Sequence, residues 1–373
     1  MTSGHINKRG DKWRARYRGP DGKERSKTFG TKREAQAWIT AQQSRQMRGE
    51  WVDPARGKVA FGEFATAWLG RQVWSKPKSK QGAASLLRSR LMPEWEHIPI
   101  NKIDYEGITD WIARMSSEVS SSRTRQAVHM LGRILDDAVK GGRLVRNPAR
   151  GLDLPGLTTT RVVTPMTIDV VEELAGKIGG AYGTLVRLLA YTGMRWAEGI
   201  AIRPVDLDFD RARVDVVRTI SEVGGKFFTT DTKTHRRRSV PLPATLAPEL
   251  KTLVQGMAPG DLLFAWGKHP RPPRSSEFFR AAWGPARLAL DLPDIRVHDL
   301  RHTCASLLIS MGAPVTVVAR ILGHSKPTTT LAIYAHLFKD ETDTWGQRLS
   351  EDVSTTCAAK LRPDEEPPGS SAG

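Results

Sequence analysis

The stretch from Arg296 to Leu337 constrains the fold most, because its apolar residues recur at helical spacing between clear breaks. His298 and Arg301 stand three residues apart and should therefore project from one face of a helix. The residues expected to face a core are Leu300, Cys304, Leu307 and Leu308. Polar chemistry and packing are thus separated on one predicted helix.

Two more helices are predicted in the same stretch. A short helix from Val315 to Leu322 should end at Gly323 in the left-handed conformation, with His324 just beyond it. The run Thr328 to Thr330 is expected to supply N-cap oxygens to a third helix, which bears Tyr334. The ends of these helices are expected to meet at one cleft.

Arginine, histidine and an exposed tyrosine in one cleft suit a phosphodiester substrate. A guanidinium offers phosphate a bidentate fork, imidazoles donate further hydrogen bonds, and tyrosine is a nucleophile that needs no metal. Because free tyrosine has a pKa of about 10, the site must remove its proton or strongly stabilise the pentavalent phosphate. One arginine supplies too little charge for this.

A second arginine is available upstream. The apolar run Leu185 to Ala190 leads through a Thr-Gly turn to Arg195. Glu198 follows three residues later on the same helical face, where a buried ion pair would fix the guanidinium of Arg195 or of a neighbouring arginine. We interpret Glu198 as a supporting residue.

The segments TGMRWAE, HDLRHT and LGHSKPTTTLAIYAH, in this order, resemble the two sequence boxes of the tyrosine recombinases, the phage integrase family. The resemblance to the catalytic domain covers roughly Thr164 to Ser350. Ala197 stands where serine is commoner and Gly199 where an apolar residue is commoner. These departures bring the packing of that helix into question more than its chemistry.

The resemblance implies a role for each matching residue. The scissile phosphate would be held by two arginines and two histidines, here Arg195, Arg301, His298 and His324. Tyr334 matches the nucleophile, and Lys233 is the best match for the lysine that protonates the departing 5′ oxygen. A 3′-phosphotyrosine would result, and the 5′ hydroxyl of a second duplex would attack it to rejoin strands.

Lys233 is favoured over Lys226 and over the arginines from Arg236 to Arg238. It lies at the tip of a predicted hairpin in which Lys226 to Thr230 pairs with Arg237 to Pro241. Its ammonium can give up a proton, whereas a guanidinium cannot.

Neither a metal nor a nucleotide cofactor is expected. The phosphotyrosine ester conserves the energy of the phosphodiester bond, and the sequence has no Walker-type GxxxxGK[ST] loop. A metal site at His298, His302 and His324 is disfavoured, because no carboxylate or cysteine stands at ligand spacing beside them.

The net charge of +17 over 373 residues favours a polyanionic partner, although it would equally suit an RNA-binding or ribosome-bound protein. The two cysteines, Cys304 and Cys357, form no disulfide framework, which fits a reducing compartment. Neither a membrane-length apolar run nor a signal peptide is found, so we expect a soluble protein of the bacterial cytoplasm.

Residues 1–54 are expected to form a three-stranded sheet backed by one helix. A P-D-G turn separates Lys12 to Arg18 from Lys23 to Phe29, and Thr31 should cap the helix. The sheet face would carry Lys12, Arg14, Arg16 and Arg18. The segment resembles the arm-site-binding domain of phage integrases and would read guanine edges in the major groove. A merely solvated basic face is the alternative.

Residues 61–155 are expected to be all helical and resemble the core-site-binding domain of integrases, which would close a clamp around DNA with the catalytic domain. Three apolar stripes should form its core: Phe61, Phe64, Ala65, Trp68 and Leu69; Ile108, Trp111, Ile112 and Met115; and Val128, Leu131, Ile134, Leu135 and Ala138. Phosphate contacts are expected from Lys78, Lys80, Arg123 and Arg125.

A flexible linker is expected from Gly156 to Thr164, followed by a catalytic domain over 164–350 and a disordered tail over 351–373. The catalytic domain should be mainly helical with a small antiparallel sheet, whose strands are predicted at Ala212 to Ile220, Phe227 to Thr230 and Arg238 to Pro241. In the resembling family the C-terminal end often docks on a neighbouring subunit.

The sequence therefore predicts a multidomain α+β protein. Its function would be that of a site-specific integrase of a phage or mobile element, acting as a homotetramer on double-stranded DNA, with an accessory DNA-bending protein as a further partner. Two alternatives stay open. One is a type IB topoisomerase, which relaxes a single duplex; the other is a DNA-binding protein with an inactive site.

Overall fold

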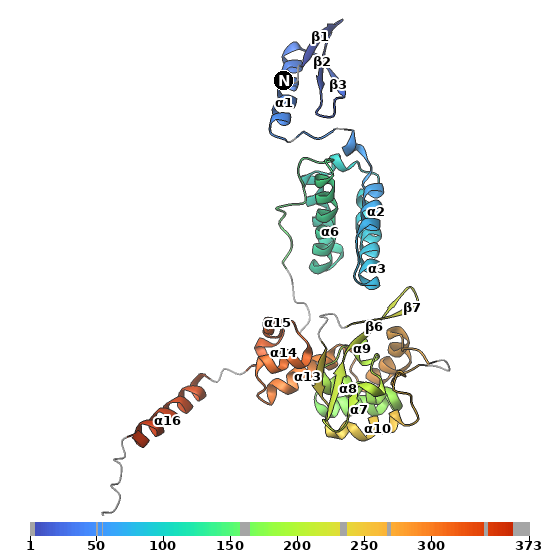
Figure 1. The fold of residues 1–373 in the computed structure, drawn as a ribbon, viewed down its shortest axis with the longest axis vertical. Helices are drawn as coiled ribbons and strands as arrows, with labels where there is room; N and C mark the ends of the chain where they lie inside the picture. Colours follow the sequence, from blue (N-terminus) through green and yellow to red (C-terminus); the bar gives the residue numbers. More distant parts are fainter. Residues whose placement is uncertain are drawn as a thin grey trace, which may run out of the picture. The chain divides into compact units, whose positions relative to one another are not determined.

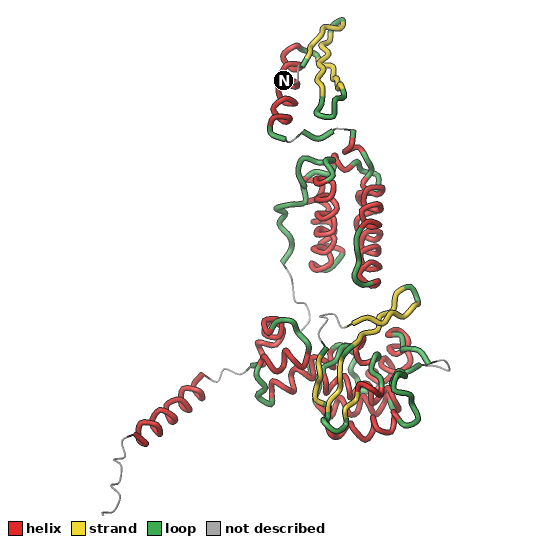
Figure 2. Tube along the Cα trace, viewed as in Figure 1, coloured by secondary structure: helices red, strands yellow, loops and turns green. Residues whose placement is uncertain are grey.

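The structure is a computed structural model that describes residues 4–49, 51–53, 55–156, 165–231, 237–266, 270–338 and 342–360. The chain divides into two compact units, Met1–Val162 and Val163–Gly373, and each is described by itself (Figures 1 and 2). Lys233 and all of the predicted linker Gly156 to Thr164 except Gly156 lie outside the described residues. No helix of the described part is long and apolar enough to cross a membrane.

The first unit begins with an antiparallel sheet backed by one helix, as predicted. The elements are β1 (His5–Arg9), β2 (Lys12–Arg18), β3 (Glu24–Phe29) and α1 (Lys32–Met47), in the sheet order β1-β2-β3. Ala15 and Tyr17 of the central strand are buried, and Ala15 packs with Ala35 and Ile39 of α1. Thr31 caps α1 by accepting a hydrogen bond from the backbone N–H of Glu34 at 3.2 Å.

The second part of this unit is helical. Its elements are η1 (Arg56–Lys58), α2 (Phe61–Arg71), α3 (Pro77–Leu86), η2 (Leu87–Leu91), α4 (Met92–Trp95), η3 (Ile100–Lys102), α5 (Tyr105–Glu118) and α6 (Ser121–Lys140). The three predicted apolar stripes form its core: Leu69 is partly buried, and the other members are buried. Helical periodicity predicts them because each stripe is a property of one helix.

The second unit contains most of the helices. They are α7 (Ile168–Ile178), α8 (Gly180–Thr192), α9 (Trp196–Gly199), η4 (Pro204–Asp206), η5 (Ala244–Leu246), α10 (Ala247–Val254), α11 (Ser275–Phe278), η6 (Phe279–Trp283), α12 (Gly284–Ala289), α13 (Asp299–Ser310), α14 (Val315–Leu322), α15 (Pro327–Tyr334), η7 (Ala335–Leu337) and α16 (Thr342–Lys360). The strands are β4 (Leu207–Asp208), β5 (Arg213–Val216), β6 (Arg218–Val223), β7 (Lys226–Asp231) and β8 (Arg238–Pro241).

Helix α8 is the centre of the main core of this unit. Its residues Leu185, Val186, Leu188 and Leu189 are at most 1% exposed, and the helix lies between α7 and α13. Gly199 packs against it so closely that an added Cβ would lie 2.7 Å from Cδ2 of Leu189. The apolar residue that is commoner at position 199 would not fit, so this departure from the family pattern is matched by the packing.

The strand pairing differs from the prediction. The expected strand Ala212 to Ile220 is two strands: β5 belongs to the sheet β4-β5-β8, whereas β6 forms a hairpin with β7. Gly224 and Gly225 explain this, because both have positive φ (57° and 77°) and make a two-residue turn of the kind that favours hairpins. The predicted pairing of β7 with β8 is therefore wrong.

The C-terminal prediction also needs correction. Helix α16 continues to Lys360, so residues 351–360 are helical and not a disordered tail. No glycine or proline interrupts the helix between Glu351 and Lys360, and the first proline is Pro363. The described side chains of residues 346–356 are exposed, among them Leu349 at 66% and Val353 at 54%.

Candidate active site

One face of α13 carries the central polar side chains of the site. His298 is the N-cap of this helix, and Arg301 and His302 follow one turn later. Arg301 is only 3% exposed, and its Nη1 donates a 2.6 Å hydrogen bond to the carbonyl oxygen of Gly193. Gly193 has φ of +65° and ends α8, which brings its backbone close to α13.

The second nitrogen of the Arg301 fork is the clearest sign of a ligand site. Among the described residues, Nη2 of Arg301 is buried without a hydrogen-bond partner. Burial, and then the positive charge of Arg195, lowers the pKa of Arg301 to about 9, so the guanidinium is still charged at pH 7. A buried, charged donor left unpaired is costly, and an anionic acceptor would satisfy it.

Arg195 lies at the start of α9, where Glu198 fixes it. Its backbone N–H donates to Oε2 of Glu198 at 2.8 Å, and its Nη1 donates to Oε1 at 3.0 Å. The Glu198 side chain is 1% exposed, whereas that of Arg195 is 32% exposed. Glu198 was predicted to orient Arg195 or a neighbouring arginine. In the structure it accepts hydrogen bonds from Arg195 and also from a neighbouring arginine.

The neighbouring arginine is Arg238, which sequence reasoning did not single out. Its Nη1 and Nη2 donate to both oxygens of Glu198 at 3.1 and 2.7 Å, and its Nε donates to the carbonyl of Ile321 at 3.0 Å. Burial alone would raise the pKa of Glu198, but Arg238 and then Arg195 lower it to about 2. The available signal was strand alternation, which places Arg238 on the same face as buried Val240.

His324 lies directly after the left-handed cap of α14, as predicted. Gly323 has φ of +68°, and the backbone N–H of His324 donates to the carbonyl of Ala319 at 2.9 Å. The ring Nδ1 lies 2.8 Å from Oγ1 of Thr330. Burial, and then the positive charges of Arg301 and Arg195, lowers the pKa of His324 to about 4, so its ring is neutral at pH 7.

The predicted capping role of the threonines is wrong. Helix α15 begins at Pro327, with Lys326 as N-cap, so Thr328 to Thr330 lie inside the helix. Proline favours the first helical position because its fixed φ suits a helix and its missing N–H is not needed there. Thr330 is fully buried and contacts His324 instead.

Tyr334 is the last residue of α15 and is buried, not exposed as predicted. It is 4% exposed and packs in a small core with Ala305, Ile309, Val318 and Leu322. Its Oη lies 2.8 Å from Nδ1 of His302. Burial raises the pKa of Tyr334 to about 12, although the charge of Arg301 opposes the shift.

The predicted catalytic residues of the two boxes lie close enough together for their charges to shift one another's pKa values. Arg301 influences the titration of His298, His324 and Tyr334, and Arg195 influences that of both histidines. Desolvation, followed by His302 and Arg301, lowers the pKa of His298. The structure thus brings together all predicted catalytic residues that it describes. His302 is an addition, and its contact with Tyr334 could not be read from sequence spacing.

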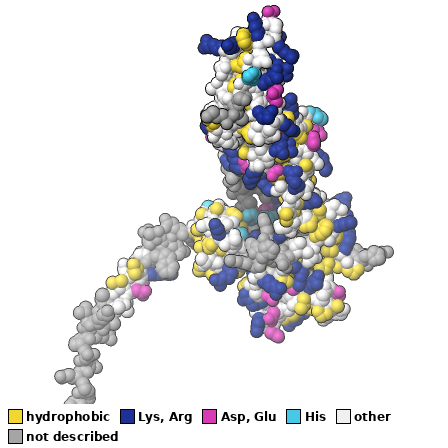
Figure 3. Space-filling model, turned by 45° about the horizontal axis from the view of Figure 1, so that its top comes forward, with side chains coloured by type: hydrophobic (Ala, Val, Ile, Leu, Met, Phe, Trp, Pro, Cys, Tyr) yellow, Lys and Arg dark blue, Asp and Glu magenta, His cyan; other side chains and the backbone are white. Residues whose placement is uncertain are grey.

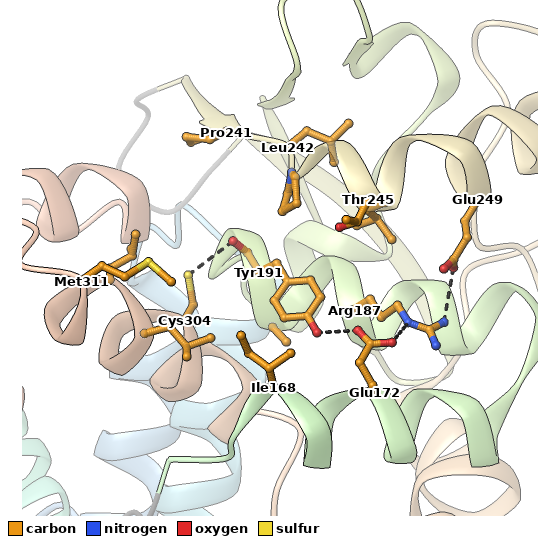
Figure 4. A pocket seen from close by; sticks show the side chains of 15 residues that line it. Ile168, Glu172, Arg187, Tyr191, Pro241, Leu242, Thr245, Glu249, Cys304 and Met311 are labelled. Atoms are coloured by element: carbon orange, nitrogen blue, oxygen red, sulfur yellow. Dashed lines mark hydrogen bonds and ion pairs between the residues drawn. The ribbon is translucent and has the colours of Figure 1, made fainter.

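Another face of α13 borders an apolar cavity of about 660 Å³ (Figure 4). Helix α13 contributes Cys304, Leu307, Leu308 and Met311 to its wall. At one side, Glu172 accepts hydrogen bonds from Nε of Arg187 at 2.6 Å and from Oη of Tyr191 at 2.5 Å. Leu300 and Cys304 are buried, at 0% and 2% exposed, and Leu308 packs against the small core of Tyr334, so the prediction that they face a core is confirmed. Cys304, Leu307 and Leu308 also line the cavity.

The basic face of the N-terminal sheet has the predicted alternation. Lys12, Arg14, Arg16 and Arg18 occupy every second position of β2, opposite to the face that packs on α1. Nη2 of Arg14 donates to Oγ of Ser26 at 2.9 Å, and Nη1 of Arg16 lies 3.5 Å from Oε1 of Glu24. Lysine and arginine side chains are frequent on the face of this unit that Figure 3 shows.

The basic residues of the helical part differ in their surroundings. Lys78 and Lys80 are exposed on α3, and Arg123 is partly exposed at the start of α6. Arg125 donates from Nε to the carbonyl of Pro155 at 2.7 Å and from Nη2 to that of Leu154 at 3.3 Å. Its guanidinium therefore has a structural role, which the sequence did not indicate.

Two family sequence models match this chain, and several relatives are similar to it. The sequence model of the "Phage integrase family" matches residues 167–341, and that of the "Phage integrase, N-terminal domain" matches residues 3–49. A prophage phiRv2 integrase of Mycobacterium tuberculosis is 29% identical over 342 residues, which cover 88% of this chain and 89% of that protein.

Two sets of solved structures share the fold. The Tn1549 transposon integrase in complex with a circular intermediate DNA gives a TM-score of 0.67 at 19% identity, covering 78% of this chain and 99% of that chain. A lambda integrase tetramer bound to a Holliday junction gives a TM-score of 0.56 at 15% identity, covering 87% and 96%. The chain belongs to the phage integrase family, the tyrosine recombinases, which are enzymes that break and rejoin DNA strands at specific sites.

Proposed function

We propose that this chain integrates or excises a phage or mobile element by cleaving and rejoining DNA at attachment sites, with Tyr334 as the nucleophile. The observation that carries the proposal is the buried fork of Arg301, whose Nη2 has no partner among the described residues and lies in one site with Arg195, His298, His324 and Tyr334. A scissile phosphate is the acceptor that this set of donors fits.

The phosphate would be held mainly by positive charge. Arg301 offers Nη2, and Arg195, whose side chain is partly exposed, offers a second guanidinium. His324 is neutral at pH 7 and can still donate a hydrogen bond. This requires that Thr330 donates to Nδ1 of His324, because Nε2 then carries the hydrogen that faces the ligand. His298 at the N-terminus of α13 would complete the clamp.

The reaction would begin with attack of Oη of Tyr334 on the phosphorus. The bond from phosphorus to the 5′ oxygen breaks, Lys233 protonates that oxygen, and a 3′-phosphotyrosine forms. In rejoining, the 5′ hydroxyl of a second duplex attacks the phosphotyrosine and releases Tyr334. Two guanidinium groups aimed at the phosphate would stabilise the charge that develops on its oxygens.

The substrate would be double-stranded DNA in the bacterial cytoplasm. The basic face of β2 is proposed to bind arm-type sites, and Lys78, Lys80 and Arg123 of the helical part are proposed to contact core-type sites. An accessory DNA-bending protein would bring the two kinds of site together. This use of two DNA sites favours an integrase over a topoisomerase.

The working form would be a homotetramer on DNA. A solved lambda integrase tetramer is bound to a Holliday junction, and the present chain shares its fold. Two features of this chain support contacts between subunits: α16 exposes the apolar residues Leu349 and Val353, and the second unit has the apolar cavity beside α13. Apolar surface of this kind is stabilised when a partner covers it.

Recombination between two DNA molecules tests the proposal. The full-length protein would be incubated with two duplexes that carry candidate attachment sites from the ends of its mobile element, without added nucleotide. Recombinant duplexes are expected. Relaxation of supercoiled DNA without strand exchange would indicate a topoisomerase, and specific binding without any cleavage would indicate an inactive DNA-binding protein. Removal of residues 1–54 should abolish recombination on full-length sites, and unchanged recombination would reject the arm-binding role.

A further inference from the structure

We propose that His302 accepts the phenolic proton of Tyr334 during strand cleavage and returns it during rejoining. The inference rests on the proposed function and adds a catalytic residue to it. His302 follows Arg301 directly in α13, and neither the clamp nor the leaving-group chemistry described above uses it.

The geometry of the pair carries the inference. Oη of Tyr334 lies 2.8 Å from Nδ1 of His302, and the ring centroids are 5.5 Å apart with planes at 59°. Both partners are held in place: His302 belongs to α13, and Tyr334 is 4% exposed among the apolar side chains of its small core. A candidate base must be within hydrogen-bond reach of the proton that it removes, and His302 is.

The second histidine of this helix face has a different place. The ring of His298 meets the ring of His302 edge-on, with centroids 5.1 Å apart and planes at 90°. His302 therefore contacts both His298 and Tyr334, in a row of three rings. This arrangement leaves His298 to the phosphate and gives His302 the contact with the phenol.

Tyr334 needs a base in this site. Its burial raises its pKa to about 12, so the phenol is protonated at neutral pH and is a weak nucleophile. A neutral imidazole with hydrogen on Nε2 accepts the phenolic hydrogen at Nδ1. The hydrogen bond of the resting site thus becomes the path of proton transfer.

Cleavage replaces one ester bond at phosphorus with another. The bond from Oη to phosphorus forms, the bond from phosphorus to the 5′ oxygen breaks, the phenolic proton passes to Nδ1 of His302, and the 5′ oxygen takes a proton from Lys233. In rejoining, the attacking 5′ hydroxyl gives its proton to Lys233, and the leaving Oη takes its proton back from His302. The charge that His302 gains lies beside Arg301, so the negative phosphate must offset it.

The test measures single-turnover cleavage by the full-length protein on a nicked suicide substrate, with His302→Ala and His302→Gln variants. Both should bind the DNA as the wild type does but cleave it about 100-fold or more slowly, the range expected for loss of a general base. Added imidazole should restore part of the activity of His302→Ala. His336→Gln is the matched control, because His336 lies two residues after Tyr334 and is exposed. This variant should cleave the DNA at the wild-type rate.

A second substrate separates base from acid. A 5′-bridging phosphorothiolate has a thiolate leaving group that needs no acid, so it should rescue Lys233→Ala but neither variant of His302. Cleavage of the normal substrate by His302→Gln within about threefold of the wild-type rate would overturn the inference, because glutamine keeps hydrogen bonding but is no base. If the wild-type protein forms no covalent adduct with the DNA, the proposed function fails. If the wild type forms the adduct and the His302 variants cleave as fast as it does, only the role of His302 fails.

Discussion

Arg238 and Glu198 form a bidentate ion pair, with Nη1 3.1 Å from Oε1 and Nη2 2.7 Å from Oε2. The pair joins β8 to α9, and Nε of Arg238 extends the connection to Ile321 at the end of α14. One guanidinium therefore ties the element that bears Arg195 to the turn that bears His324. The positions of both phosphate-binding candidates depend on it.

Glu198→Gln should destabilise the protein strongly. The substitution removes the charge that compensates Arg238, whose side chain is 9% exposed, and the loss of one partner from a buried pair costs about 3–5 kcal/mol. Glu94→Gln is the control, because its partner Arg114 is 57% exposed and such a pair contributes about 1 kcal/mol or less. Urea unfolding measures both, and equal losses would contradict the role of Glu198.

Arg195→Ala and Arg301→Lys should each slow strand cleavage by about 100-fold or more, since one donor to the reacting group contributes roughly 3 kcal/mol. Lysine at 301 keeps the charge but cannot reproduce the fork that holds Gly193 and a ligand together. Arg320→Ala removes an exposed arginine of α14 and should leave the single-turnover rate unchanged. Near-normal cleavage by the Arg195 or Arg301 variant would argue against the phosphate clamp.

The pKa of His324 predicts a dependence of stability on pH. The ring has a pKa of about 4 in the folded protein and about 6.5 in the unfolded chain, so between these values the unfolded chain binds a proton that the folded protein excludes. The free energy of unfolding should therefore fall as the pH is lowered from about 6.5 to 4. His324→Gln should remove this part of the decrease, as urea unfolding at several pH values would show. An unchanged slope would contradict it.

Gly193→Ala should destabilise the protein more than Gly312→Ala. Both glycines have positive φ, +65° and +81°, so both substitutions strain the backbone. An added Cβ at Gly193 would also lie 2.6 Å from Cδ2 of Leu322, whereas none of the described atoms lies within 4 Å at Gly312. The difference in free energy of unfolding should be about 1–3 kcal/mol. A displaced Gly193 carbonyl should also slow cleavage, because it holds Arg301.

The basic sheet face should bind DNA through its charges. Arg14→Ala and Arg16→Ala should each weaken binding to arm-type DNA and lower the slope of log affinity against log salt by about 1. Arg33→Ala is the control, because Arg33 is exposed on α1, on the other side of the sheet. Equal effects of all three substitutions in a salt titration would indicate a general charge effect and not a binding face.

The sequence predicted those parts whose signals are local. The stripe of Ile108, Trp111 and Ile112 lies on one helix, so the helical spacing of apolar residues is enough to predict it. The cap at Gly323 is formed by one turn, so the glycine itself predicts it. The pair Gly224 and Gly225 was an equally local signal for the β6–β7 hairpin. The predicted hairpin instead pairs Lys226 to Thr230 with Arg237 to Pro241, and this pairing is wrong.

Contacts between distant segments were beyond sequence reasoning. Glu198 was expected to orient Arg195 or a neighbouring arginine, but only the fold brings Arg238 of β8, which is 40 residues away, to Glu198. The contact of Tyr334 with His302 depends likewise on how α15 and η7 pack against α13 and α14. The same packing buries the tyrosine, whose exposure was predicted from its chemistry alone.

The most direct measurement of the central proposal is a covalent trap. The protein is incubated with a nicked suicide substrate that carries a candidate attachment site, and the products are separated on a denaturing gel and mapped by mass spectrometry. We predict an adduct through a 3′ phosphate at Tyr334, which Tyr334→Phe should abolish while DNA binding is retained. The absence of any adduct on DNA that the protein binds specifically, or an adduct at another residue, would contradict the account.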